Sequence, residues 1–325
     1  MRRVGGGAVG GGRAVGGALV GGRVDDPSIR PVGRAGCPTT LRPCYPSAGG
    51  PSVMVPQHTA SQRSQRDRSD ARPRRSRRTQ RHLLGMRPVS EVTVASFNTH
   101  WGVDRRGRRF DVVDVCKRLD ADVLALQEVW RPNGGTGFVD DVAAALGATL
   151  LELVLTPDTF RARPKHLPIP PGPPGTWGLA VLSRLPVRER FDVDLGHALG
   201  DPVPRRVALC AEVGVDGRPL VFAAVHASHR LYGSPPQLRR LARVLDERRT
   251  PNVIAGDCNM WGAVLAPLLR DRRRAVRGAT WPAGMPHSQI DHLWVSDGLA
   301  VVDGEVLGRT GSDHRPVRAR LRLTD

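Results

Sequence analysis

The sequence predicts an α/β protein in which two mixed β-sheets pack face to face and helices flank them. From residue 92 onward, apolar runs of strand length alternate with a few segments of helical periodicity. Between residues 177 and 226, four strand-like runs follow one another with only turn residues between them. Because strands outnumber helices, a sandwich of mixed sheets fits this order better than a simple parallel barrel.

The elements are expected in the following order. Strands are predicted over residues 92–98, 122–128, 149–155, 177–183, 187–195, 206–213, 220–226, 252–257, 290–296, 301–307 and 317–323. Helices are predicted over residues 111–119, 138–146, 235–248 and 263–273. Pro235 suits the first turn of its helix, and Asp216-Gly217 predicts a hairpin turn. The Pro-rich segment 163–175 is expected to be a long loop.

Residues 1–85 differ from the rest in composition. They are rich in Gly, Pro and Arg, carry 16 Arg against 4 Asp, and cannot bury enough apolar surface to form a core. They could be a disordered basic arm that binds nucleic acid, or they could come from an over-extended start, with the natural chain beginning at Met86. We favour the second alternative, since a strand follows Met86 almost at once, and we expect residues 86–325 to form the folded domain.

Net charge and cysteine content indicate what kind of protein this is. The chain carries a net charge of +18, but residues 86–325 contribute 33 basic and 27 acidic residues, so the expected domain is only mildly basic. The five cysteines are odd in number and form no CxxC pair, which argues against a disulfide framework or a zinc site. No apolar run is long enough to span a membrane, and no signal peptide is evident. We therefore expect a cytoplasmic protein.

Polar side chains close several of the predicted strands. Asp257 and Asn259 follow the apolar run 253–255, and alternation along a strand would place both on one face. Similar endings occur at Asn98, Glu128 and His226. Two Asp-His pairs, Asp291-His292 and Asp313-His314, flank later strands. So many polar strand ends in one chain predict a catalytic rim.

These motifs, in this order, resemble the endonuclease/exonuclease/phosphatase superfamily. The resemblance rests on Ser-Phe-Asn-Thr, Leu-Gln-Glu-Val, Val-His-Ala-Ser, Gly-Asp-Cys-Asn, Ile-Asp-His and Ser-Asp-His, and it extends over about residues 92–323. Each motif alone is weak, but six in the family's order are specific. The resemblance implies a deoxyribonuclease-I-like, four-layer α/β sandwich with its site at one end of two packed sheets. One departure is Gln289, where many relatives carry Arg.

The resemblance also implies a metal-dependent phosphoric ester hydrolase. Glu128 would be the principal ligand of Mg²⁺, or of Mn²⁺ in its place, with Asn98 and Asp313 in or beside the metal shell. A carboxylate at a strand end is a hard oxygen donor of the kind that Mg²⁺ prefers.

The catalytic residues implied by the resemblance are His226, Asp257, Asn259, Asp291 and His314. Asp257 would orient or deprotonate the attacking water, and Asn259 would donate to the phosphoryl oxygens or the water. Asp291 would fix the tautomer of His314 and favour its cationic form, which we prefer over a role as base. His226 would donate to the phosphate. For His292 we expect a packing role.

The substrate is less constrained by the sequence. The first hypothesis is a Mg²⁺-dependent phosphodiesterase that acts on nucleic acid through in-line attack of water. The alternative is a phosphatase or phosphodiesterase of a small phosphorylated metabolite, inositol phosphate or phospholipid headgroup. A remote third is a non-catalytic nucleic-acid-binding protein. A monomer is expected, although nothing in the sequence fixes the oligomeric state or separates endo from exo cleavage.

Overall fold

The computed structural model describes residues 90–157, 175–203 and 205–324, all within the compact unit Ser52–Asp325. The predictions for residues 1–85, and for the Pro-rich loop up to residue 174, lie outside the described residues.

The first sheet has the strand order β11-β12-β1-β2-β4-β3. Its strands are β1 (Glu91–Asn98), β2 (Val123–Pro132), β3 (Thr149–Pro157), β4 (Gly175–Ser183), β11 (Leu299–Val306) and β12 (Val317–Leu323). Only β1 and β2 are parallel, and the other neighbouring pairs are antiparallel. The sheet is therefore mixed, as predicted.

The second sheet has the order β5-β6-β7-β8-β10-β9. Its strands are β5 (Val187–Gly196), β6 (Arg206–Val215), β7 (Arg218–His226), β8 (Asn252–Asp257), β9 (Arg272–Arg274) and β10 (Asp291–Ser296). The parallel pair in this sheet is β7 and β8. The β6–β7 hairpin turns at Asp216-Gly217, where both residues have positive φ (47° and 83°), so the predicted hairpin turn is a primed turn.

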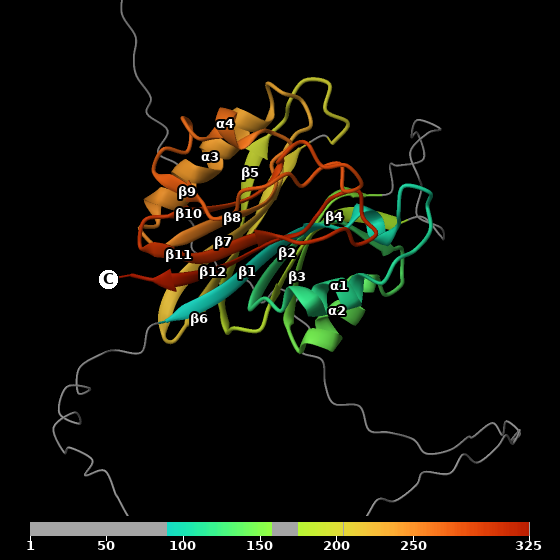
Figure 1. The fold of residues 1–325 in the computed structure, drawn as a ribbon, viewed down its shortest axis with the longest axis horizontal. Coiled ribbons are helices and arrows are strands. Elements are labelled where there is room, and N and C mark those ends of the chain that lie inside the picture. Colours follow the sequence, from blue (N-terminus) through green and yellow to red (C-terminus); the bar gives the residue numbers. More distant parts are fainter. Residues whose placement is uncertain (1–89, 158–174, 204, 325) are drawn as a thin grey trace, which may run out of the picture. The chain divides into compact units, whose positions relative to one another are not determined.

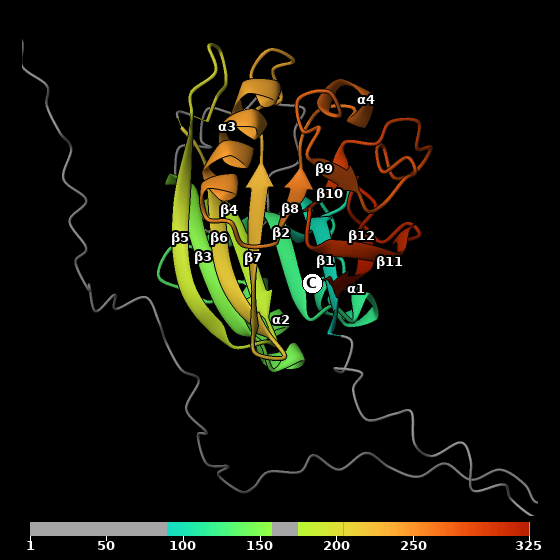
Figure 2. The same cartoon turned by 90° about the vertical axis from the view of Figure 1, so that its left-hand side faces the viewer.

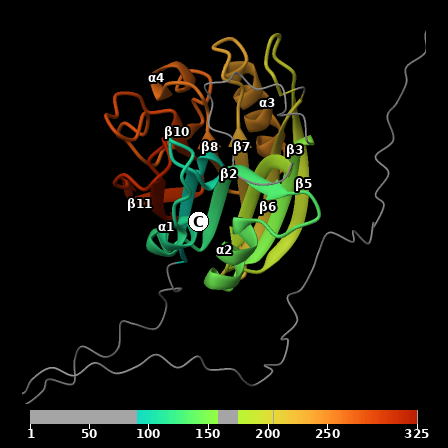
Figure 3. The same cartoon turned by 90° about the vertical axis from the view of Figure 1, so that its right-hand side faces the viewer.

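Helices cover the outer face of each sheet (Figure 1). On the first sheet lie α1 (Val112–Leu119) and α2 (Phe138–Leu146), and on the second lie α3 (Ser234–Glu247) and the short α4 (Gly262–Leu265). Figure 2 shows α3 running along the second sheet, and Figure 3 shows α1 and α2 on the side of the first. A short 3₁₀ helix, η1 (His100–Gly102), follows β1.

Three apolar clusters join these layers. The largest lies between the sheets and contains Leu179 of β4 and Phe222 of β7. A second joins Leu241 of α3 to Trp294 of β10, and a third joins Leu119 of α1 to Leu126 of β2. The chain therefore forms the expected four-layer α/β sandwich.

One predicted helix is wrong. In place of a helix over residues 263–273, the chain forms the four-residue α4 from residue 262, a series of turns and then β9, which pairs with β10. Pro267 removes a helical donor, and the side chain of Arg272 is buried against Asp246 at 2.7 Å and Asn252 at 3.0 Å. These contacts between distant segments outweigh the local helical pattern.

The two parallel pairs bring the site to one end of the sandwich. Strands β1 and β2 run the same way, as do β7 and β8, and the ends of β1 and β8 meet where Asn98 contacts Asp257. Gly256 allows β7 and β8 to approach there, because a Cβ at this position would lie 1.9 Å from the Val225 carbonyl oxygen. Among the described residues, no helix is long and apolar enough to cross a membrane.

Candidate active site

Asp257 lies at the centre of the group of polar residues that the sequence singled out. It ends β8, where His226 of β7 and Asp291 of β10 are its register partners on the two sides. Its side chain is 2 % exposed. Asp257 Oδ2 accepts a hydrogen bond from Asn98 Nδ2 at 3.0 Å, and Oδ1 accepts one from the backbone N–H of Asn259 at 2.8 Å. Both carboxylate oxygens are therefore held in place.

His314 forms a buried pair with Asp291. Its Nδ1 lies 2.9 Å from Asp291 Oδ2, and its Nε2 lies 3.7 Å from Asp257 Oδ2. Nδ1–H therefore donates to Asp291 while Nε2 faces Asp257. Burial disfavours the charged imidazole, but the carboxylates of Asp291 and Asp257 outweigh it and raise the pKa of His314 well above 6.5. The two carboxylates therefore favour the imidazolium form of His314.

The surroundings of His226, in contrast, favour the neutral imidazole. Its Nε2 lies 3.6 Å from Asp257 Oδ2, and its buried Nδ1 has no hydrogen-bond partner. Burial, together with the nearby positive charge of Arg206, lowers the pKa of His226 well below 6.5. The site thus places one neutral and one charged imidazole beside the same carboxylate.

Glu128 does not end its strand, contrary to the sequence prediction. β2 continues to Pro132, and Glu128 lies at a bulge where the register with β4 shifts, with a φ of 54°. This conformation turns the carboxylate toward Asn98, whose Nδ2 lies 3.4 Å from Oε1. Burial and the charge of Asp313 raise the pKa of Glu128 to about 7. Alternation along a regular strand could not reveal this bulge.

Ser312 and Asp313 precede His314 in a loop that is fixed to β1. Ser312 Oγ donates to the backbone oxygen of Asn98 at 2.7 Å and accepts from the backbone N–H of His314 at 3.1 Å. Asp313 is partly exposed, and its Oδ1 lies 3.9 Å from His314 Nε2. The sequence motif therefore contributes a structural hydroxyl that we did not predict, in addition to its acid and its imidazole.

Asn259 lies close to Asp257, but not through strand alternation as predicted. The strand ends at Asp257, and Asn259 has a left-handed φ of 47°. Its Nδ2 donates to the backbone oxygen of Ala227 at 3.1 Å. An amide nitrogen has two donors, so one N–H remains for a ligand.

The donor set fits a divalent cation. Glu128 Oε2 is buried and has no hydrogen-bond partner, and the carboxylates of Asp257 and Asp313 raise the pKa of Glu128 by repulsion. A cation bound here would give Glu128 Oε2 a partner and would offset the repulsion between the carboxylates. Atoms of Asp257, Asp291 and His314 also lie within 4.8 Å of one another. That second group is a poorer candidate, because a protonated imidazole engaged by Asp291 has no free lone pair.

A buried ion pair behind His226 was missed at the sequence level. Arg206 Nε donates to Asp201 Oδ2 at 3.0 Å, and both side chains are almost fully buried. Arg206 also donates to the backbone oxygen of His226 at 3.2 Å and lies over the Trp177 ring, which packs 5.2 Å from the His226 ring. Nothing in the local sequence distinguishes Arg206 from its exposed neighbour Arg205.

The remaining residues that the sequence raised have structural contacts. His292 is fully buried, with Nε2 3.0 Å from the Met260 oxygen, in agreement with the expected packing role. Gln289 Nε2 donates to the backbone oxygen of Val276 at 2.9 Å, and this bond joins the segment before β10 to the segment after β9. Trp261 is 50 % exposed, and its indole N–H donates to Ser288.

Comparison with known proteins supports the class that this geometry suggests. The profile of the Endonuclease/Exonuclease/phosphatase family matches residues 95–314, so the chain belongs to this family. Members of the family are phosphoric ester hydrolases that generally depend on a divalent metal, and the chain is an enzyme of this class. No curated protein sequence matches the chain significantly.

Solved structures share the fold at low sequence identity. An endonuclease/exonuclease/phosphatase from Beutenbergia cavernae is 23% identical with a TM-score of 0.55, covering 72% of each chain. The human nocturnin catalytic domain with bound sulfate is 17% identical with a TM-score of 0.56, covering 73% of this chain and 96% of that one. A mannosyl-6-phosphatase from Bacteroides thetaiotaomicron is 19% identical with a TM-score of 0.52, covering 71% and 99%.

Proposed function

We propose that the enzyme hydrolyses phosphodiester bonds, with nucleic acid as its substrate and Mg²⁺ as its metal, by in-line attack of water on phosphorus. The observation that carries this proposal is the convergence on Asp257 of Asn98, His226 and His314, whose side chains reach its Oδ2 from β1, β7 and the loop before β12. An oriented carboxylate beside a neutral and a cationic imidazole can move a proton and stabilise negative charge in one place.

Glu128 and Asp313 would hold the metal through carboxylate oxygens, which suit Mg²⁺, with Mn²⁺ as a substitute. Asn98 would lie beside the metal shell, because its Nδ2 faces Glu128 and Asp257 and its Oδ1 accepts from the backbone N–H of His100 at 3.0 Å. When bound, the metal polarises a phosphoryl oxygen and lowers the pKa of a coordinated water. The unpartnered Glu128 Oε2 supports this assignment.

Asp257 would receive the proton of the attacking water. Asn98 and the backbone of Asn259 hold its two oxygens, so the carboxylate needs little reorientation before it accepts a proton. The second N–H of the Asn259 amide would donate to the water or to a phosphoryl oxygen.

The two histidines would stabilise the negative charge on the phosphoryl oxygens in the transition state. His314 would do so as a cation held by Asp291, and His226 as a neutral donor. Asp291 touches neither substrate nor metal in this scheme and acts as a positioning residue.

Nucleic acid is favoured as substrate by charge. Residues 86–325 carry a net charge of +6, and several exposed arginines lie in the loops near Asp313. The alternative is a small phosphorylated metabolite, inositol phosphate or phospholipid headgroup, and the fold shared with a mannosyl-6-phosphatase keeps it in consideration.

A substrate panel tests the proposal. The full chain would be incubated with Mg²⁺ and supercoiled plasmid, abasic duplex, single-stranded RNA or inositol phosphates, with EDTA as the control. We expect cleavage of at least one nucleic acid, and a rate at low substrate that falls steeply with salt as counterions are released. Turnover of small esters alone, with little salt dependence, would move the enzyme to the phosphatase alternative.

A further inference from the structure

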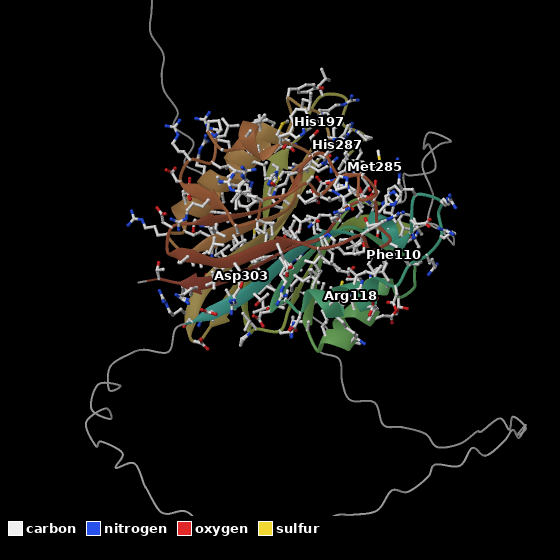
Figure 4. The ribbon with its side chains drawn as sticks, in the orientation of Figure 1. Phe110, Arg118, His197, Met285, His287 and Asp303 are labelled. Atoms are coloured by element: carbon white, nitrogen blue, oxygen red, sulfur yellow. The ribbon has the colours of Figure 1, made fainter. Side chains whose placement is uncertain are left out.

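A hollow of about 490 Å³ opens beside Asp313. It is lined by the loop 104–108, the turn 283–284 and the loop 309–313, so the residue proposed to face the metal also forms part of its wall. Four arginines line it: Arg105, Arg106, Arg108 and Arg309. Figure 4 labels Phe110 and Met285, which flank these segments in the sequence, on the side of the domain toward which β1 runs.

The loop 104–108 is held rigid by Asp104. Its Oδ1 accepts from the backbone N–H groups of Arg106 at 2.8 Å and Arg108 at 2.9 Å, while Oδ2 accepts from Arg108 Nε at 2.8 Å. These bonds lower the pKa of Asp104 to about 2, and the bonds from Arg108 contribute most to this shift. Asp104 therefore stays ionised at neutral pH and compensates the charge of Arg108.

The other arginines of the hollow are left without acidic partners. Within the described part of the chain, Arg105, Arg106 and Arg309 make no ion pair or side-chain hydrogen bond, and all three are exposed. Among the described residues that line the wall, Asp313 is the only other acid, and the proposed metal would compensate it. The hollow thus carries an excess of positive charge that the protein itself does not neutralise.

Contact between the two loops fixes the shape of the hollow. Gly311 lies directly against Phe110, since a Cβ at position 311 would lie 2.3 Å from Phe110 Cγ. Phe110 in turn packs edge-to-face on the buried Phe97, with ring centroids 6.3 Å apart. The loop that carries Arg309 is thereby seated on the loop that carries Arg105 and Arg106.

We infer that this hollow binds a second phosphate group of the substrate, next to the phosphate that is hydrolysed. The inference rests on the proposed function and specifies its substrate as a molecule with at least two phosphates. Guanidinium groups match phosphate oxygens in both charge and geometry, and three unpaired ones on two fixed loops form a suitable cradle. A substrate with a single phosphate would leave the cradle unused.

The test compares substrates with one and two phosphates. Arg105, Arg106 and Arg309 are replaced together by alanine and, separately, by lysine; Arg239→Ala, on the exposed side of α3, is the control. The substrates are bis(p-nitrophenyl) phosphate, the 5′-phosphorylated thymidine dinucleotide and an inositol bisphosphate. For each two-phosphate substrate that the wild-type enzyme hydrolyses, we expect the alanine variant to lose at least ~10-fold in kcat/KM. The lysine variant should recover part of that kcat/KM. Hydrolysis of bis(p-nitrophenyl) phosphate should be unchanged.

A binding measurement separates this inference from the proposed function. Calorimetric titration of the full chain with the dinucleotide and the bisphosphate, in EDTA to prevent turnover, reports on the hollow even if no substrate is hydrolysed. We expect weaker binding of at least one ligand in the alanine variant and an unchanged affinity in Arg239→Ala. Equal affinities in wild type and alanine variant, or an equal loss of kcat/KM on one- and two-phosphate substrates, would overturn the inference.

Discussion

Asn98 Nδ2 donates a hydrogen bond to Asp257 Oδ2 at 3.0 Å, and this bond joins the end of a strand in one sheet to the end of a strand in the other. The same nitrogen lies 3.4 Å from Glu128 Oε1. One amide therefore lies between the carboxylate proposed as base and the carboxylate proposed as metal ligand. The relative placement of the two sheets sets the geometry of the site.

We expect Asn98→Ala to lower kcat by at least ~10-fold, because Asp257 loses the donor that orients it. Ser96→Ala is a matched control on the same strand, since Ser96 Oγ donates to Gln127 and not to the site. Circular dichroism would establish that both variants fold. An equal rate in the two variants would show that the bond to Asp257 has no part in turnover.

Glu128→Gln removes a buried negative charge whose environment raises its pKa to about 7. In EDTA at pH 8, above this pKa, we expect a higher Tm than wild type, because the cost of burying the charge and the repulsion from Asp313 are relieved. The Mg²⁺ concentration that gives half-maximal activity should rise at least ~10-fold. Calorimetry and metal titration measure the two effects. Glu305→Gln, on exposed β11, should change neither, and a Glu128→Gln that behaved the same way would refute the metal assignment.

Arg205 and Arg206 provide a matched pair of neighbours. Arg206→Ala leaves Asp201 buried without its partner, so we expect a loss of roughly 3–5 kcal/mol in the free energy of unfolding. Arg205→Ala breaks an exposed pair with Asp194, which water screens, and should cost far less. Urea unfolding measures both. Similar losses for the two variants would contradict the structural role given to Arg206 behind His226.

His292 should make stability depend on pH. Burial lowers its pKa from 6.5 to about 4 in the folded protein, so its ionised form is favoured by unfolding. The contribution of His292 to the free energy of unfolding is fully present above pH 6.5 and is lost as the pH falls toward 4. Between pH 7.5 and pH 5 the loss amounts to roughly 2 kcal/mol. His292→Gln should reduce the loss measured by urea unfolding at these two pH values. His197→Gln, at an exposed position, is the control, and identical pH dependence in both variants would refute the assignment.

The sequence was informative where polar residues close apolar runs. Asn98, His226 and Asp257 end their strands as predicted, because the burial of a strand and the polarity of its last residue are both local features. The order of strands and helices could be predicted for the same reason, except in residues 263–273, where β9 was missed.

Features that depend on distant contacts could not be predicted. The bulge at Glu128 follows from the register between β2 and β4, and the burial of Arg272 follows from packing against α3. The Arg206–Asp201 pair is likewise visible only once the loop before β6 is folded. In each case the deciding partner is set by the tertiary structure, so local periodicity carries no signal for it.

The most direct test of the proposed function is the rate of bis(p-nitrophenyl) phosphate hydrolysis by the full chain and by Asp257→Asn, each with saturating Mg²⁺ and with EDTA. Asp303→Asn, at an exposed position of β11, is the control. We predict Mg²⁺-dependent turnover that Asp257→Asn lowers by at least ~10²-fold, with Asp303→Asn near the wild-type rate. Near-wild-type turnover by Asp257→Asn at saturating Mg²⁺ would contradict the account.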